Sequence, residues 1–178
     1  RRKIQNFINA KHDFEVIFTK GTTEGINLVS YILTQKLKKD DEIIISYLEH
    51  HSNIVPWQML CERTGAKRRV IPIDENGVLQ LDYLDQFLSE KTKVVSVNQV
   101  SNALGVVNPI EEIIAKTRAN SDAYIVIDGA QSAPHFKIDV QALDCDFFVF
   151  SGHKMYAPMG TGILYGKQEV LESLPPFH

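Results

Sequence analysis

This 178-residue sequence lacks long hydrophobic runs, a cysteine framework and an excess of either charge. No stretch approaches the roughly 18 apolar residues of a transmembrane helix, and no signal-peptide pattern opens the chain. The 19 basic and 22 acidic side chains are interspersed and leave a net charge of −3, so nothing favours binding to nucleic acid or to an anionic membrane. Only two cysteines occur, Cys61 and Cys145, and from this scarcity we expect a reducing compartment and a cytoplasmic protein.

What is present is the composition of an ordinary globular protein, 44% apolar and 23% charged. The length suffices for one domain with a substantial core. The first residue is Arg1 rather than Met, the chain begins inside a predicted helix, and it ends after Pro175 and Pro176 without an evident stop. We therefore interpret residues 1–178 as an internal piece of a longer protein.

Apolar runs of strand length alternate with amphipathic runs of helical period along the whole chain. The pattern predicts strands at 15–18, 42–46, 69–72, 93–97, 124–127, 147–150 and 163–165, and helices at 2–11, 26–37, 54–63, 82–88 and 109–117. Such alternation is typical of an α/β fold in three layers, α/β/α, around a mostly parallel, seven-stranded sheet. The last two strands are too close together for a helical crossover, so we expect them to be antiparallel.

The segment 146–162 contains the residues that most suggest chemistry. The apolar run 147–150 predicts a buried strand, and His153 and Lys154 follow where this strand should end, before the small-residue turn 158–162. Partial burial at such an edge favours the uncharged amine that a Schiff-base lysine needs. Taken alone, an ordinary surface lysine after a strand is the alternative.

Two further polar clusters follow predicted strands nearer the start of the chain. The segment 20–25 lies between a strand and a helix, where free backbone amides and hydroxyl groups can face an anion. An ordinary helix start, capped by Thr22 or Thr23, is the alternative. His50 and His51 follow the next strand, and such a pair lies more often in a polar loop than on a metal ion.

Five predicted strands in all end in residues capable of chemistry. In an open α/β sheet, ligands bind at the carboxyl ends of the strands, so these clusters are expected to meet in one pocket. The residues concerned are Thr22, Thr23, His50, His51, Asn102, Asp128, Gln131, His153 and Lys154.

This set suits pyridoxal 5′-phosphate. That cofactor needs a lysine for its aldehyde, an acid at its pyridine nitrogen, a donor for its phenolate, a flat group against its ring and a cradle for its phosphate. The residues available for these parts are Lys154, Asp128, Gln131, His50 and 21–23. A lone Asp128 could equally be a turn or helix-capping residue, but Gly129 after it would let a ring approach the backbone closely.

Five segments carry a resemblance to a known family: GTTEGIN (21–27), LEHHSNIVPWQMLC (48–61), VSNALG (100–105), DGAQS (128–132) and QALDCDFFVFSGHKMYAPMGTGILYG (141–166). With these motifs the sequence resembles the SUF-type (SufS-like) cysteine desulfurases. They belong to the class V aminotransferase group of fold-type I, pyridoxal-phosphate-dependent enzymes. The resemblance implies that residues 1–178 form the cofactor-binding large domain, without an N-terminal segment and a C-terminal small domain.

The resemblance also implies a role for each site residue. Lys154 would form the Schiff base with the cofactor, Asp128 would pair with the pyridinium nitrogen, and His50, the first of the pair, would stack on the ring. Gln131 would bond the phenolic oxygen. The other cofactor contacts that it implies are Thr22, Thr23, Asn102, Ser151 and His153.

By the same resemblance, the enzyme would convert L-cysteine to L-alanine and transfer the sulfur as a persulfide for iron–sulfur cluster assembly. It would act as a homodimer with a SufE-like or SufU-like sulfur acceptor. The persulfide-forming cysteine would lie outside this chain, so we expect the chain alone to be a poor catalyst and Cys61 and Cys145 to be buried, inert thiols. The alternatives are a selenocysteine lyase, a kynureninase-like hydrolase, an aminotransferase, or a non-catalytic scaffold that binds a partner.

Overall fold

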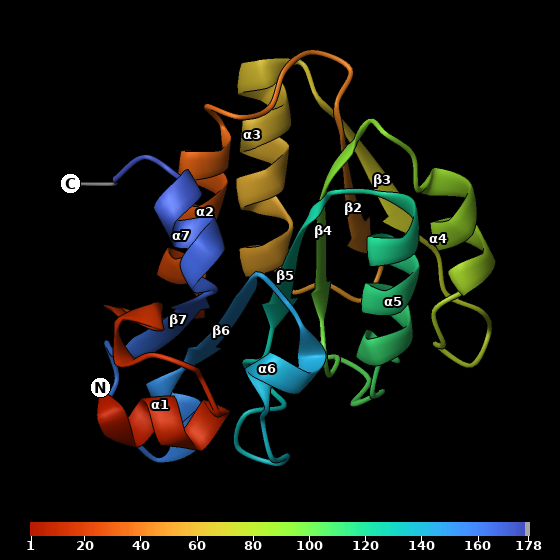
Figure 1. The fold of residues 1–178 in the computed structure, drawn as a ribbon. Coiled ribbons are helices and arrows are strands. Elements are labelled where there is room, and N and C mark those ends of the chain that lie inside the picture. Colours follow the sequence, from red (N-terminus) through yellow and green to blue (C-terminus); the bar gives the residue numbers. More distant parts are fainter. Residues whose placement is uncertain (177–178) are drawn as a thin grey trace.

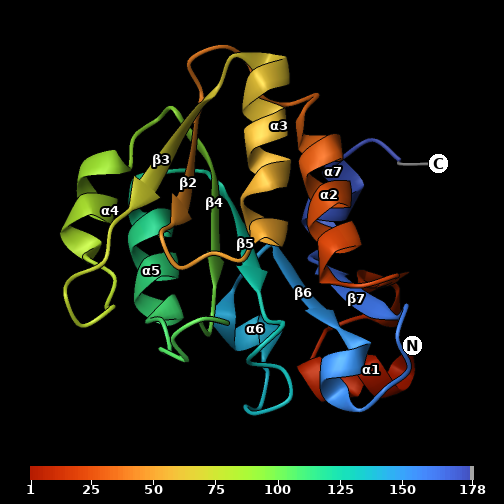
Figure 2. The same cartoon turned by 180° about the vertical axis from the view of Figure 1, so that it is seen from behind.

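A computed structural model describes residues 1–176, in which helices flank one seven-stranded sheet (Figures 1 and 2). The strands are β1 (Val16–Thr19), β2 (Glu42–Ser46), β3 (Lys67–Ile71), β4 (Thr92–Asn98), β5 (Tyr124–Asp128), β6 (Phe147–Ser151) and β7 (Gly162–Gly166). The α-helices are α1 (Arg2–Ile8), α2 (Thr22–Leu33), α3 (Val55–Thr64), α4 (Leu81–Phe87), α5 (Ile110–Asn120), α6 (Val140–Leu143) and α7 (Gln168–Ser173). Three short 3-10 helices join them: η1 (Asp13–Glu15), η2 (His51–Asn53) and η3 (Gly152–Met155).

The strands lie in the order β1-β7-β6-β5-β4-β2-β3. Strands β3, β2, β4, β5 and β6 pair in parallel, whereas β7 runs antiparallel to both β6 and β1. The predicted α/β class, the seven mostly parallel strands and the antiparallel pairing of the last two are confirmed. The antiparallel pairing of β1 with β7 was not predicted, because nothing local in the sequence shows that the first strand neighbours the last.

Both faces of the sheet are covered, which explains why inner strands such as β2, β5 and β6 are nearly continuous apolar runs. Successive side chains of a strand point to opposite faces, so Ile43 and Ile45 join a core with α2 and α3 while Ile44 joins a core with α4 and α5. Figures 1 and 2 show α2 and α3 side by side on one face of the sheet. Trp57 of α3 is 0% exposed between that helix layer and the strands.

Several predicted boundaries differ from the structure for local reasons. The predicted helix 2–11 ends at Ile8, because Asn9 adopts a left-handed conformation with φ 53°. The predicted helix 26–37 is α2, which starts four residues earlier and ends at Leu33. The predicted strand 69–72 begins at Lys67, since an edge strand can carry exposed charged residues. Helices α6 and α7 were missed because segments of 4 and 6 residues show no helical period. Among residues 1–176, no helix is long and apolar enough to cross a membrane.

Candidate active site

The carboxyl ends of β1, β2, β4, β5 and β6 lie at one edge of the sheet, as their pairing directions require. A cavity of about 210 Å³ opens at this edge. It is lined by Thr22, Thr23, His50, Ser52, Asn98, Val100, Asn102, Asp128, Ala130, Gln131, Ser151, His153 and Lys154. The cavity therefore contains all nine residues to which the family resemblance assigns cofactor contacts.

The cavity has a buried floor and an exposed rim. Thr22, Asn98, Asp128 and Ser151 are all at most 5% exposed, whereas the rim residues His50, Thr23, Asn102 and His153 are open to solvent. Lys154, on η3 directly after β6, lies between the two and is half-buried. Polar groups that converge from five strands on one small cavity are a common arrangement for a binding site.

The start of α2 is joined to the end of β6 by hydrogen bonds at the cavity floor. The Thr22 amide donates to Ser151 Oγ over 2.9 Å, and the two hydroxyl groups are 2.8 Å apart. A Cβ added to Gly162 would lie 2.4 Å from Gly21 Cα, so only glycine lets these backbones approach so closely. This contact places the amide-rich N-terminus of a twelve-residue helix at the cavity, where an anionic group is favoured.

Asp128 ends β5 and is 4% exposed. Its Oδ1 accepts a hydrogen bond from the Ala130 amide over 2.9 Å, and its Oδ2 accepts none from the part of the chain that the structure describes. Burial raises the pKa of Asp128, while the Ala130 amide and the charges of Lys154 and His50 act in the opposite direction. The free oxygen of this buried carboxyl can accept a further hydrogen bond, and a cationic donor would also offset the cost of burying its charge.

The structure explains the glycine at position 129 differently from the sequence, which suggested room for a ligand ring. A Cβ on Gly129 would lie 2.1 Å from the ring of Phe148 on the neighbouring strand β6. Gly129 is therefore required by packing inside the protein, and the close approach of a ligand ring is not needed to explain it.

His50 is held in a fixed orientation by Ser52, a residue that sequence reasoning missed. The Ser52 amide donates to His50 Nδ1 over 3.1 Å, and the Ser52 hydroxyl lies 2.8 Å from the same nitrogen. Because a backbone amide can only donate, Nδ1 is the acceptor of that bond, and this edge of the ring is turned toward Ser52. The position of Ser52 two residues after a strand-end histidine is the signal that could have identified it.

Asn98 was also missed, although it ends β4 and lines the cavity. Its side chain donates to the Leu48 carbonyl over 2.6 Å and accepts from Asn108 Nδ2 over 2.6 Å. The rule that strand ends carry the site would have included it, had the predicted strand extended one residue beyond 97. Val100 and Ala130 complete the lining, and their apolar side chains gave no signal.

Three residues considered in the sequence lie outside the cavity. His51 contacts His50 edge to face, with ring centroids 6.0 Å apart, but does not line the cavity. Cys145 is buried as expected, whereas Cys61 is only partly buried, because it packs at the margin of the core formed with Trp57. Neither thiol belongs to the site.

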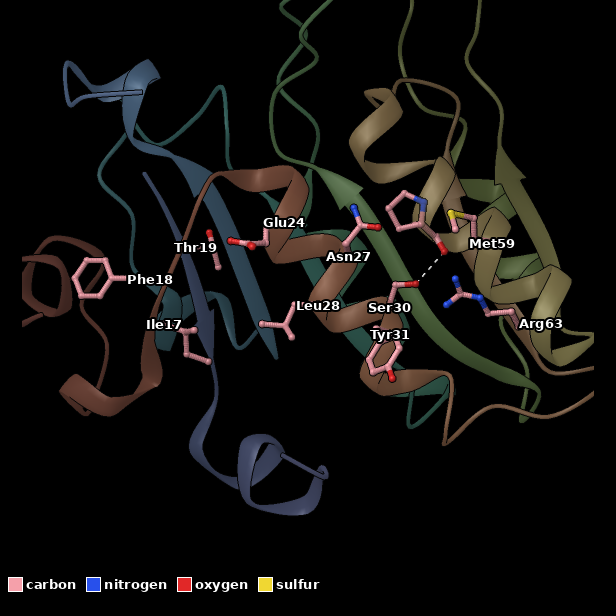
Figure 3. Close-up of a pocket in the computed structure, with 11 residues that line it drawn as sticks. Ile17, Phe18, Thr19, Glu24, Asn27, Leu28, Ser30, Tyr31, Met59 and Arg63 are labelled. Carbon is pink, nitrogen blue, oxygen red and sulfur yellow. Dashed lines mark hydrogen bonds between the residues drawn. The ribbon is translucent and has the colours of Figure 1, made fainter. Parts of the chain in front are cut away.

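A larger cavity of about 620 Å³ lies elsewhere, beside β1 and between α2 and α3 (Figure 3). Ile17, Leu28 and Met59 contribute apolar atoms, and Ser30 donates to the Pro56 carbonyl over 2.8 Å. This cavity brings together no set of titratable groups like the one at the strand ends. The titratable residues at the strand ends therefore indicate that the smaller cavity is the candidate active site.

Comparisons with known proteins all indicate the same family. The profile of the class-V aminotransferases matches residues 1–178. The chain is 51% identical to a cysteine desulfurase of Enterobacter sp. (strain 638) and 52% identical to one of Synechococcus elongatus, in each case over 99% of this chain. It covers 44% of the first relative and 28% of the second, less than half of either.

Solved structures agree with this. The cysteine desulfurase CsdA from Escherichia coli superposes with a TM-score of 0.95 at 39% identity, over 99% of this chain and 44% of that one. A variant of C-DES with glycine covalently linked to its PLP cofactor gives a TM-score of 0.87 at 27% identity, over 99% of this chain and 47% of that one. The seven-stranded sheet and the converging strand ends are thus those of a recognised enzyme family, and this chain belongs to the class V aminotransferases.

Proposed function

We propose that residues 1–178 are the pyridoxal-phosphate-binding large domain of a cysteine desulfurase, which converts L-cysteine to L-alanine and passes the sulfur on as a persulfide. The observation that carries the proposal is the single cavity in which Lys154, Asp128 and His50 meet the N-terminus of α2. Support also comes from relatives at about half identity that bear the name cysteine desulfurase.

The cavity fits the cofactor part by part. Asp128 offers a free carboxylate oxygen to a protonated pyridine nitrogen, and the amide-rich start of α2 offers Thr22 and Thr23 to a phosphate. Ser151 accepts a hydrogen bond from the Thr22 amide at that helix start, and His153 lines the same cavity. Gln131 and Asn102 line the remaining wall.

When bound, the cofactor supplies an electron sink for a substrate carbanion. Asp128 would hold the ring nitrogen in its protonated form, because a buried negative charge is best compensated by a cation. Lys154 would hold the cofactor covalently, and its amine would hold or move the proton at the substrate carbon. His50 presents a flat ring over the cavity, in an orientation fixed by Ser52.

The finer assignments also belong to this proposal. The motifs EHHSNIVPW and SGHKMYAPMGTG support a SUF-type desulfurase that acts in the cytoplasm, supplies iron–sulfur cluster assembly and delivers sulfur to a SufE-like or SufU-like acceptor. A homodimer is part of the same proposal. The persulfide-forming cysteine is assigned to a segment outside these 178 residues, since neither Cys61 nor Cys145 lines the cavity.

The test uses the full-length gene product with L-cysteine and a reductant, and measures alanine and sulfide in the same sample. Equal amounts of alanine and sulfide are expected. Absence of alanine, with transfer of the amino group to a keto acid instead, would refute the desulfurase and indicate an aminotransferase, while the cofactor residues would stand.

A further inference from the structure

A buried carboxyl group lies directly behind the cavity without lining it. Glu49 is 8% exposed and immediately precedes His50. Its Oε2 accepts from Asn53 Nδ2 over 2.6 Å, and its Oε1 accepts from the Asn98 amide over 3.0 Å and from the Ser46 hydroxyl. This one side chain therefore connects the carboxyl ends of β2 and β4 with the loop that carries His50.

The direction of these hydrogen bonds is determined by a tryptophan. Trp57 Nε1 donates to Asn53 Oδ1 over 2.9 Å, and the Ser96 hydroxyl donates to the same oxygen over 2.6 Å. An indole N–H can only donate, so the Asn53 amide must turn its oxygen toward Trp57 and its nitrogen toward Glu49. Both Asn53 and Trp57 are 0% exposed, so water cannot replace a partner that is lost.

Three residues of the cavity depend on this arrangement. His50 and Ser52 lie between Glu49 and Asn53 in the sequence, and the Asn98 amide donates to Glu49. We propose that Glu49 and Asn53 form a directional carboxyl–amide pair whose role is to position His50, Ser52 and Asn98 for the cofactor. Both are positioning residues, and only the identity of the cofactor rests on the proposed function.

If Glu49 and Asn53 form a directional pair, exchanging their two groups should restore what each single substitution loses. Two residues that were merely buried would not show this recovery. In Glu49→Gln, the new NH2 group must face either the Asn53 NH2 or the Asn98 amide, so two donors meet. In Asn53→Asp, two carboxyl groups meet where Glu49 and Asn53 now lie 2.6 Å apart. The double variant E49Q/N53D exchanges the two groups: the side-chain amide at position 49 donates to the carboxylate at position 53, which still accepts from Trp57 and Ser96.

The experiment compares the wild type, both single variants and the double variant in the full-length protein. Hydrogen–deuterium exchange of peptides covering 47–55 is measured without cofactor, and binding of pyridoxal 5′-phosphate is measured by absorbance. Each single variant is expected to exchange faster and to bind the cofactor about tenfold more weakly, the effect of one mispaired buried hydrogen bond. The double variant is expected to recover most of both properties.

The matched control is Glu15→Gln. Glu15 is 2% exposed and accepts from the His12 and Gln168 amides over 2.8 and 3.0 Å, at the opposite end of β1 from the cavity. This variant should lose stability without a change in exchange at 47–55 or in cofactor affinity. Wild-type behaviour of Glu49→Gln, or a double variant no better than the single ones, would overturn the proposal. If the wild type binds no cofactor, the proposed function fails, and the exchange data still decide on the pair.

Discussion

At the scale of the residue, the site is a set of polar groups whose chemistry is set by burial. Desolvation raises the pKa of Glu49 to about 8, against the hydrogen bonds from Ser46, Asn53 and Asn98, which favour the ionised form. Asp128 experiences the same conflict on the floor of the cavity, and its pKa is also raised. Buried acids with few compensating cations are frequent at catalytic sites, which is consistent with the proposed role of this edge of the sheet.

Glu49 should make stability depend on pH. An acid whose pKa is raised on folding contributes stability that is fully present below its unfolded pKa of 4.5 and is lost as the pH rises through about 8. We expect the free energy of unfolding of the wild type to fall between these pH values, and to fall less steeply in Glu49→Gln, by up to about 1.4 kcal/mol per pH unit. Urea denaturation of both proteins at several pH values measures this, and equal slopes would contradict it.

Lys154 should be the lysine that the cofactor modifies. It lines the cavity, and no salt bridge holds it among residues 1–176, whereas Lys167 is paired with Asp144 at 2.7 Å. After incubation with pyridoxal 5′-phosphate and reduction with borohydride, mass spectrometry should find the adduct on Lys154 and not on Lys167. Lys154→Ala should abolish both the adduct and turnover, and modification spread over many lysines would refute the assignment.

At the scale of the element, the site depends on the short distance between the start of α2 and β7. The structure places the start of α2 at Thr22, four residues before the predicted start, because the apolar period that defined the prediction begins only at Ile26. The first turn is instead stabilised by Ser151, which is 129 residues away in the sequence. No local pattern could show this bond.

Gly162→Ala should therefore separate α2 from β7. Its Cβ would lie 2.4–2.7 Å from backbone atoms of Gly21, which cannot move aside as a flexible side chain can. We expect a loss of about 3 kcal/mol in the free energy of unfolding. The control is Gly166→Ala at the other end of β7, where the nearest atoms belong to the Leu171 side chain and the expected loss is below about 1 kcal/mol. Equal losses in the two variants would show that the close backbone contact is unimportant.

At the scale of the whole molecule, the reactivity of the two cysteines tests how well the core excludes solvent. Cys145 is 0% exposed in the core shared with α5 and α6, and burial raises the pKa of its thiol; Cys61 is only partly buried. Iodoacetamide should label Cys61 slowly in the native protein, and Cys145 only when the molecule unfolds. Peptide mass spectrometry with and without denaturing urea measures both rates. Labelling of native Cys145 at the rate of Cys61 would contradict this core packing.

The sequence by itself determined which segments are strands, that they alternate with helices, and that five strands end in reactive residues. It could do so because apolar periodicity and strand-end polarity are local properties. The choice of His50 over His51 came from the family resemblance; of these two histidines, His50 lines the cavity.

Only the tertiary structure decided the strand order, the place of β1 beside β7, and the entry of Ser52 and Asn98 into the site. It also decided that Glu49 meets the Asn98 amide, 49 residues away, and that packing against Phe148 by itself requires a glycine at position 129. These features depend on contacts between segments that are distant in the chain. Such contacts exist only once the core has brought the strands together, so no local pattern encodes them.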